Sequence, residues 1–509
     1  MTESQRRLSP SGSPPFDPAV VIRSRAYLTA LLLAAILGIP ISAVSYGFLA
    51  LVAAIQEFVF VDLPRNVFDG SVPVWWPVPW LLMCGLLTAA TIRYLPGNGG
   101  HSPALGFVVG GPPRNREIPT IALAALTTLS LGAVLGPEAP LIALGGGLAA
   151  LTVRLVRRDA PPMAVTVMAS AGSFAAVSTL LGSPVLGAFL IMEAAGVGGV
   201  TLTLVALPGL IASGVGALIF VGLNGWTGLG TFSLALTDLP PAVTPTWATL
   251  AWAIAVGAAG ALLGWAIRWI GLSLRPTVHR RRVLVTTVIG LLIGLCATGY
   301  TLLSGKDFSQ VLFSGQTALP VLVQQASSYS GGVLVLLIAF KVLTYGLSLS
   351  AFRGGPVFPA MFIGAALGIA LADLPGMSLA PAIGMGIGAM SCAMLRLPLT
   401  STLLATLLLG ADGVTETPVV VVAVAVAFVV TMVLPTPGPD QTAPEPEPSK
   451  ERERGARSAE DANVLDLHWS TRRPSTSSSC PVARRWVYPS GLPAILGCLA
   501  DNVPVRRIR

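Results

Sequence analysis

The chain has little charge, few cysteines and almost no histidine. Only 11% of its 509 residues are charged, whereas soluble domains carry about 25%, so an ordinary water-soluble fold is excluded. The five cysteines and three histidines are scattered and show no metal-ligand spacing, so we expect no metal site and no cofactor. Cys84, Cys296 and Cys392 lie in apolar runs, where a thiol packs as a small hydrophobic group.

What the chain has instead is apolar sequence. A hydrophobic content of 53% and a mean hydropathy of +0.76 predict a polytopic membrane protein, with a lipid membrane as its surroundings. No cleavable signal pattern is present, and Arg6, Arg7, Arg23 and Arg25 before the first apolar run predict a cytoplasmic N-terminus. The net charge of +8 reflects loop Lys and Arg that flank membrane segments, so no nucleic-acid partner is expected.

Composition divides the chain into three regions. Residues 1–25 form a polar N-terminal segment, residues 26–434 a membrane domain, and residues 435–509 a polar tail rich in proline, charge and serine. Such a tail cannot bury a core, so we predict that it is disordered and that the C-terminus is cytoplasmic.

The membrane domain is predicted to be an internal repeat of broken helices. Many of its apolar runs are too short to span the membrane and begin at Gly or Pro, so the helices must break at membrane depth. Non-helical backbone is tolerated there only where it lines a cavity or is buried in protein. Residues 172–188 and 386–402 echo each other, with Pro184 and Pro398 in matching places. We therefore expect an all-α fold of tilted and broken helices in two antiparallel halves, 26–223 and 247–434, around a midplane site.

The stretch Gly136-Pro137-Glu138-Ala139-Pro140 places one carboxylate at the start of an apolar helix. Proline is favoured in the first turn of a helix, so free N–H groups and the positive end of the helix dipole point at the space near Glu138. A carboxylate at such depth is costly and indicates function. The alternative is a first-turn Glu that satisfies only its own helix.

Three Gly/Pro turns are predicted to open apolar helices: residues 97–103, 136–140 and 354–359. Glycines let backbone approach a ligand, and helix N-termini bind anions weakly enough for permeation. Cation transport favours several buried carboxylates, but only Glu138 and Glu193 lie deep in apolar runs. The ring edge of Phe358 either faces the anion or packs in the core.

These turns, in this order and spacing, resemble those of the CLC family of chloride channels and proton-coupled chloride transporters. The second turn is similar to the family's Gly-Lys/Arg-Glu-Gly-Pro motif, which carries the gating glutamate, here Glu138. The third is similar to Gly-x-Phe-x-Pro, whose backbone amides face chloride, and the first to Gly-Ser-Gly-Ile-Pro. The anion-binding residues that the resemblance implies are Gly136, Pro137, Ala139, Gly355, Pro356, Val357, Phe358, Gly99, Gly100 and Ser102.

The sequence also departs from the family pattern. Pro137 and Ala139 replace a basic residue and a glycine, and Val357 occupies the usual phenylalanine position. Asn98, Gly100 or Ser102 aligns with the ion-binding serine, and residues 435–439 contain no counterpart of the chloride-binding tyrosine. We expect no counterpart of the tandem regulatory domains found in many eukaryotic members.

The position of the family's inner proton-relaying glutamate is Ala194, next to Glu193. Adjacent helix residues point about 100° apart, so Glu193 cannot simply substitute. Glu193 belongs either to a proton path or, as we favour, to a hydrogen-bonded contact that holds helix ends together.

The resemblance implies a homodimer in the bacterial plasma membrane, with one pore per subunit, that passes chloride or a similar small anion. Such a protein is not an enzyme. We expect Glu138 to be its gate and coupling to protons to be weak or absent. Two alternatives remain: a proton-coupled chloride exchanger, and an inverted-repeat transporter of an unrelated organic solute. A purely structural scaffold is disfavoured, because buried Glu138 and the Gly/Pro turns would be costs without a use.

Overall fold

The structure, a computed structural model, describes residues 22–196, 199–236, 244–410 and 413–435. All of them belong to one compact unit, Met1–Pro439, and a second unit spans Asp440–Arg509. Most of the predicted N-terminal segment and nearly all of the predicted tail therefore lie outside the described residues.

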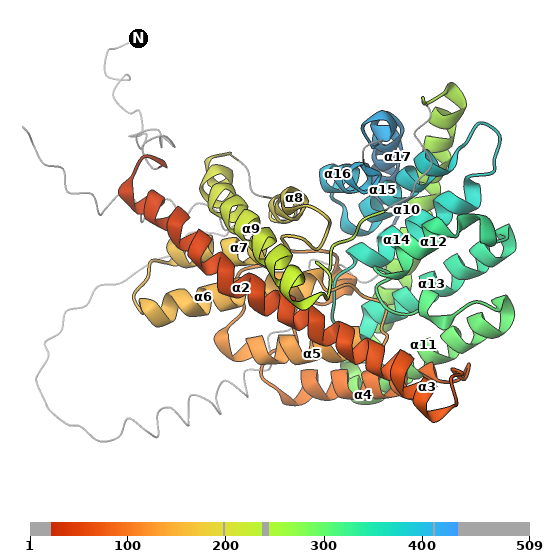
Figure 1. The fold of residues 1–509 in the computed structure, drawn as a ribbon, viewed down its shortest axis with the longest axis horizontal. Helices are drawn as coiled ribbons and strands as arrows, with labels where there is room; N and C mark the ends of the chain where they lie inside the picture. Colours follow the sequence, from red (N-terminus) through yellow and green to blue (C-terminus); the bar gives the residue numbers. More distant parts are fainter. Residues whose placement is uncertain (1–21, 197–198, 237–243, 411–412, 436–509) are drawn as a thin grey trace, which may run out of the picture. The chain divides into compact units, whose positions relative to one another are not determined.

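The described residues form helices and connecting turns without any multi-residue strand, which confirms the all-α prediction (Figure 1). Among the described residues, seven stretches are long and apolar enough to cross a membrane, and five further apolar helices are shorter. The helices of the first half are α2 (Arg25–Glu57), η2 (Phe58–Asp62), α3 (Leu63–Val67), α4 (Pro77–Tyr94), η3 (Pro103–Leu105), η4 (Asn115–Glu117), α5 (Ile118–Ser130), α6 (Glu138–Val156), α7 (Pro162–Ala176), α8 (Pro184–Ala194) and α9 (Gly199–Thr227). Those of the second half are α10 (Trp247–Arg280), α11 (Arg282–Ser304), η5 (Phe308–Gln310), α12 (Ala318–Gln324), η6 (Ala326–Ser328), α13 (Gly331–Ala351), α14 (Val357–Leu371), α15 (Leu379–Leu395), α16 (Pro398–Leu408) and α17 (Gly413–Val433).

Helix α2 does not end where the sequence suggests. The stretch from Val59 to Trp76, with its several aromatic residues, favours a loop by sequence, but a π-turn and α3 continue the helical path to Val67. Pro64 stands at the start of α3, where a helix tolerates proline. Phe60 is buried against Phe313, with ring centroids 5.0 Å apart, so packing rather than local turn chemistry extends the helix.

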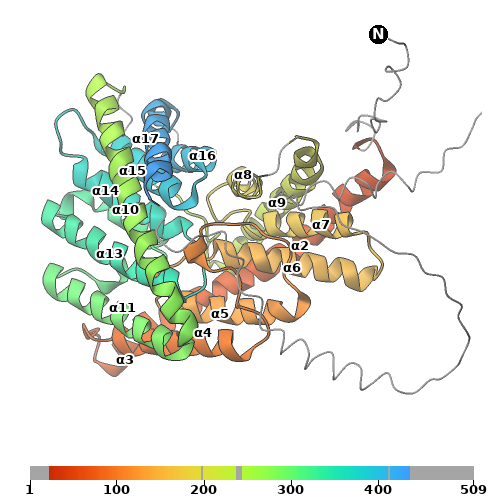
Figure 2. The same ribbon diagram turned by 180° about the vertical axis from the view of Figure 1, so that it is seen from behind.

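Two short helix pairs repeat each other, one in each half. Helices α6 and α7 pack where Gly145 meets Gly172, and α14 and α15 pack where Gly364 meets Gly386 (Figures 1 and 2). A Cβ on any of these four glycines would overlap the carbonyl oxygen of its partner. Gly145 lies nine residues after Gly136, and Gly364 lies nine residues after Gly355, so the two halves match in register.

Helix α14 lies in the middle of this arrangement. Every residue from Val357 to Ala366 is buried, although the helix is only 15 residues long. A helix too short to span and fully covered by protein presents its first turn to the interior rather than to a membrane surface. That first turn is where the candidate site lies.

Candidate functional site

The second and third Gly/Pro turns meet in space. The Gly136 N–H donates to the Gly355 carbonyl at 2.8 Å, and the Gly355 N–H donates to the Gly136 carbonyl at 2.6 Å. This isolated antiparallel bridge fixes the starts of α6 and α14 side by side, with Pro137 and Pro356 as their N-cap residues. Neither N-cap residue caps its own helix with a side chain, so the first-turn N–H groups of both helices need a partner from elsewhere.

Glu138 lies at this junction and is fully buried. Its Oε1 accepts a hydrogen bond from the Val357 N–H at 2.5 Å, so a carboxylate from α6 caps the first turn of α14. Its Oε2 has no hydrogen-bond partner among the described residues. A negative oxygen at a helix N-terminus occupies the place that favours an anion.

The two glycines of the bridge leave room for this carboxylate. A Cβ at Gly136 or at Gly355 would overlap the side chain of Glu138. Neither glycine adopts a left-handed backbone conformation, so close approach, and not the φ angle, is what requires glycine here.

Two polar residues of α13 support the junction from behind. The buried Tyr345 hydroxyl donates to the Pro356 carbonyl at 2.8 Å, and the buried Ser348 hydroxyl accepts from the Val134 N–H at 3.0 Å. Helix α13 therefore holds the backbone on both sides of the bridge.

A buried arginine connects the first Gly/Pro turn, residues 97–103, with the third, residues 354–359. Arg353 is 6% exposed, and its Nε and Nη2 donate to the Asn98 carbonyl at 3.1 and 3.0 Å. It brings a full positive charge beside the predicted anion-binding turns. In the sequence it shows only as a lone Arg directly before Gly354-Gly355-Pro356.

The prediction that the first Gly/Pro turn, residues 97–103, opens an apolar helix is wrong. Only η3, a single 3₁₀ turn, follows Ser102, and its C-cap Gly106 has a φ of 98°. Gly110, Gly111, Pro112 and Pro113 come soon after and prevent a regular helix over this stretch.

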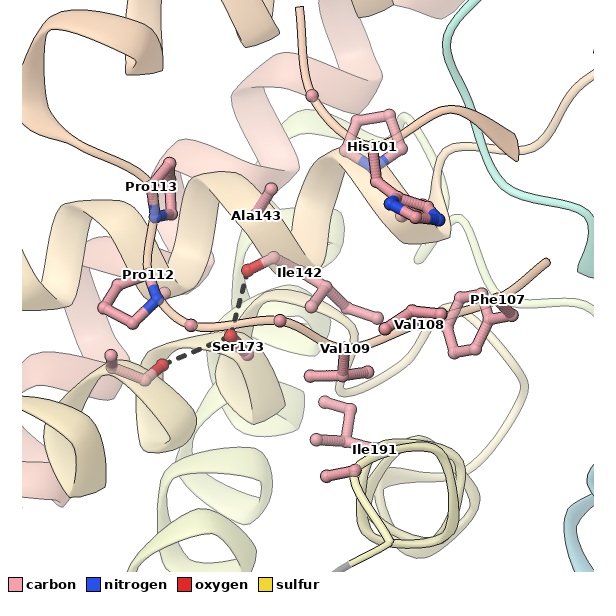
Figure 3. A pocket seen from close by; sticks show the side chains of 18 of the residues that line it. His101, Phe107, Val108, Val109, Pro112, Pro113, Ile142, Ala143, Ser173 and Ile191 are labelled. Atoms are coloured by element: carbon pink, nitrogen blue, oxygen red, sulfur yellow. Dashed lines mark hydrogen bonds between the residues drawn. The ribbon is translucent and has the colours of Figure 1, made fainter. Parts of the chain in front are cut away.

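A cavity of about 580 Å³ adjoins the junction. Figure 3 shows the segment from Phe107 to Pro113 crossing in front of α6, with Ile191 of α8 on the far side of the segment. Only some of the predicted anion-binding residues line this cavity. Gly99, Gly100, Ala139 and Pro356 line it, whereas Gly136, Pro137, Glu138, Gly355, Val357, Phe358 and Ser102 do not.

The side chains of Phe358 and Glu193 have other surroundings. Phe358 is 1% exposed and packs in the large apolar core with Met361 and Phe362. Glu193 stands at the end of α8 and caps α16: its Oε1 accepts from the Leu399 N–H at 3.0 Å, and its Oε2 accepts from the Thr400 N–H and hydroxyl at 2.6 and 2.5 Å.

Several buried polar residues were not found from the sequence. Lys341 in α13 donates to the Leu312 and Phe313 carbonyls at 2.7 and 3.1 Å, and Glu416 is buried in the first turn of α17. Arg268 in α10 is 5% exposed. The sequence shows Lys341 and Arg268 each as a single charge inside an apolar run, whereas Glu416 stands in a stretch with Asp412 and two threonines.

The fold and the junction define a class: an all-helical integral membrane protein with two opposed helix starts around a buried carboxylate. A family model described as "Voltage gated chloride channel" matches residues 108–432, which is more than half of the chain. The chain belongs to this family, the CLC family. The match begins after the first Gly/Pro turn, so that turn keeps only its resemblance to the family motif.

Similar proteins agree with this assignment. A protein of Salmonella choleraesuis (strain SC-B67) named "Putative ion-transport protein YfeO" is 29% identical over 361 residues, covering 69% of this chain and 82% of that one. The crystal structure of a CLC-type fluoride/proton antiporter is similar with a TM-score of 0.62 and 20% identity, covering 82% of this chain and 99% of that one. A slow cyanobacterial Cl⁻/H⁺ antiporter also gives a TM-score of 0.62 at 20% identity, with 79% and 94% covered. Members of the family are channels or transporters, and anion transport is the function that this membership supports.

Proposed function

We propose that this protein passes chloride or a similar small anion across the membrane and that Glu138 is the gate. The single observation that carries the proposal is the hydrogen bond from the Val357 N–H to Glu138. Ionised, Glu138 is a tethered anion that occupies the start of α14 and competes with a permeating ion for it.

Opening requires the carboxylate to leave. Once Glu138 is protonated or swung aside, the Val357 N–H at the start of α14 becomes available to an anion. The adjoining cavity reaches Ala139 and Pro356, one residue away from Glu138 and Val357 on each helix, and offers space for the displaced side chain and for the ion.

The binding groups are backbone amides, supported by the nearby charge of Arg353. Amides and helix dipoles hold an anion without a bound, fully charged partner, so the ion can leave as well as enter. The buried and glycine-lined junction also excludes bulky solutes, which argues against an organic solute as the cargo.

We further propose that anion movement is weakly coupled or uncoupled to protons. The residue in the family's relay position is Ala194, and both Glu193 oxygens are engaged at the start of α16. A proton-coupled exchanger is the second candidate, because the two similar solved structures are antiporters by name. The same proposal includes a homodimer with cytoplasmic termini in a bacterial plasma membrane.

The test is reconstitution of the purified protein in liposomes, with chloride efflux and external pH recorded together. We expect chloride efflux with little uphill proton movement. Robust proton pumping at a fixed anion-to-proton ratio, abolished by Glu193→Gln, would instead establish an exchanger. Absent chloride flux together with saturable uptake of an organic solute would overturn the anion proposal.

A further inference from the structure

Two arginines meet where α10 contacts the end of α15. Small residues form the first part of the contact between the two helices. A Cβ at Gly260 would lie 3.0 Å from the Ala389 Cβ, and one at Gly264 would lie 2.7 Å from the Ala393 Cβ. The two helices run in the same direction along this contact, and helix neighbours on one face are three or four residues apart. The next residues on it are Arg268 and Arg396.

Within the described part of the chain, neither of these two cations forms an ion pair with a carboxylate. Arg268 is 5% exposed, Arg396 is half-buried, and the positive charge of Arg396 acts on Arg268 through space. The Nε atom of each has no hydrogen-bond partner among the described residues, and the ion pair found in that part of the chain is Arg157 with Asp159. Buried like charges repel and lose hydration, so the pair requires a negative partner.

The backbone of Arg396 adds a second, independent observation. Its φ of 58° lies in the left-handed region, which is unfavourable for a residue with a Cβ. The matching position of the first half is Gly182, also two residues before the proline that opens the next helix, with a φ of 86°. The second half thus keeps an arginine where the first half uses the residue that suits this backbone.

We propose that Arg268 and Arg396 together bind a halide ion, at a position separate from the Gly136–Gly355 junction. A monatomic anion suits the place, because Arg268 is too buried to meet a lipid headgroup or an organic phosphate. The guanidinium groups supply charge-assisted N–H donors. The position is connected to the junction through Tyr345, which lies within electrostatic range of Arg268 and bonds to the Pro356 carbonyl.

A competing source of negative charge is the chain itself. The Trp265 Nε1 donates to the Pro435 carbonyl at 2.9 Å, so Pro435 lies beside α10 within one helical turn of Arg268. Residues 436–509 contain Asp and Glu. An experiment must therefore separate a free halide from a carboxylate of that segment.

The test compares thermal unfolding of the purified full-length protein in sodium chloride and in sodium gluconate at equal ionic strength. The wild type is expected to unfold at a higher temperature in chloride. Arg268→Gln and Arg396→Gly are expected to lose most of this difference, with halide affinity reduced about tenfold or more. Arg268→Lys keeps the charge and retains part of the response, and exposed Arg154→Gln is the control that retains all of it.

Two features keep the test decisive. Arg396→Gly removes both the repulsion and the left-handed backbone cost, so in gluconate this variant should unfold no lower than the wild type. In crystals grown with bromide, an anomalous peak should lie between the two side chains in the wild type and be absent from Arg268→Gln.

The proposal fails if both variants keep the full chloride response, or if no bromide peak appears between the arginines. It also fails if a chain that ends at Pro435 unfolds in chloride at a lower temperature than the full-length protein. A carboxylate of residues 436–509 would then be the negative partner of the two arginines. Because binding is measured without transport, an arginine-dependent chloride response in a protein with no flux would contradict only the proposed function.

Discussion

The two halves of the membrane domain build the same turn and put different residues in it. Glu138 and Val357 each lie two residues after their glycine, Gly136 or Gly355, and each is the first residue of its helix. The first half supplies a carboxylate and the second supplies the backbone N–H that receives it. The repeat thus provides a symmetric frame, and the chemistry comes from where the halves differ.

The other departures from symmetry have the same character. Glu193 of the first half caps α16 of the second, and Arg353 of the second half holds the Asn98 carbonyl of the first. Residues that break the repeat are therefore those that bind one half to the other, and the following variants test this rule.

The largest effect is expected for Glu138→Gln. The amide keeps the size of the side chain but cannot ionise, so anion efflux should lose most of its pH dependence while the protein still folds. Efflux measured across a pH series in liposomes checks this, with Glu193→Gln as the matched carboxylate variant. Wild-type pH dependence in Glu138→Gln would remove Glu138 as the gate.

A smaller effect on the same property is expected for Gly355→Ala. The added Cβ would overlap the Glu138 side chain and push the carboxylate away from the Val357 N–H. Efflux at high pH should rise relative to the wild type, because the tethered anion no longer fits. Gly47→Ala, where a Cβ meets open space, is the control. Unchanged efflux in Gly355→Ala would mean that the carboxylate does not block the path.

Equal effects in both halves are expected for Gly145→Ala and Gly364→Ala. Each Cβ would overlap a backbone carbonyl of the partner helix, at Gly172 or Gly386. Overpacking of this kind costs about 1–3 kcal/mol, and the two losses of unfolding free energy should agree closely. Denaturant titration in detergent measures both, and a large loss in one half alone would disprove the equivalence of the two pairs.

Much of the fold follows from the sequence, because apolar run length and Gly/Pro breaks are local signals. They predict the all-α class, the repeat and a helix start at Pro137 or Pro140, next to the observed start at Glu138. They fail at Val59–Val67, where packing of Phe60 extends a helix, and at residues 104–109, where Gly106 and the later Gly/Pro residues prevent one.

The site is only partly visible in the sequence for a physical reason. Glu138 is evident because a carboxylate in an apolar run is costly. Its partner is a backbone N–H 219 positions away, which has no side-chain signature at all. Arg353, Tyr345 and Arg268 act through contacts between distant helices, and the sequence shows each only as a single polar residue.

A modest effect is expected for Glu193→Gln. Its carboxylate accepts three hydrogen bonds at the start of α16, and loss of a helix cap costs about 1 kcal/mol. Unfolding free energy should fall by that amount, with chloride efflux close to the wild type. A variant that keeps its stability but loses proton movement would assign Glu193 to a proton path.

The smallest effect is expected from deletion of residues 436–509. The Trp265–Pro435 hydrogen bond and the junction at Glu138 both lie in the part that remains. Chloride efflux per assembled protein should be nearly unchanged. Loss of flux in a truncated protein that still inserts in the membrane would show that the tail completes the path.

The Gly136–Gly355 bridge also has a consequence for biogenesis. When a ribosome has released only the first half, Glu138 lies in an apolar segment without the amide that later receives it. A carboxylate in hydrocarbon is costly, so the half-made protein must keep Glu138 hydrated or protonated until Gly355 and Val357 arrive. Chain order therefore makes insertion of the second half the step that commits the first to its final depth. Fragments ending before Gly355 should be retained less well in the membrane, and Glu138→Gln should improve their retention.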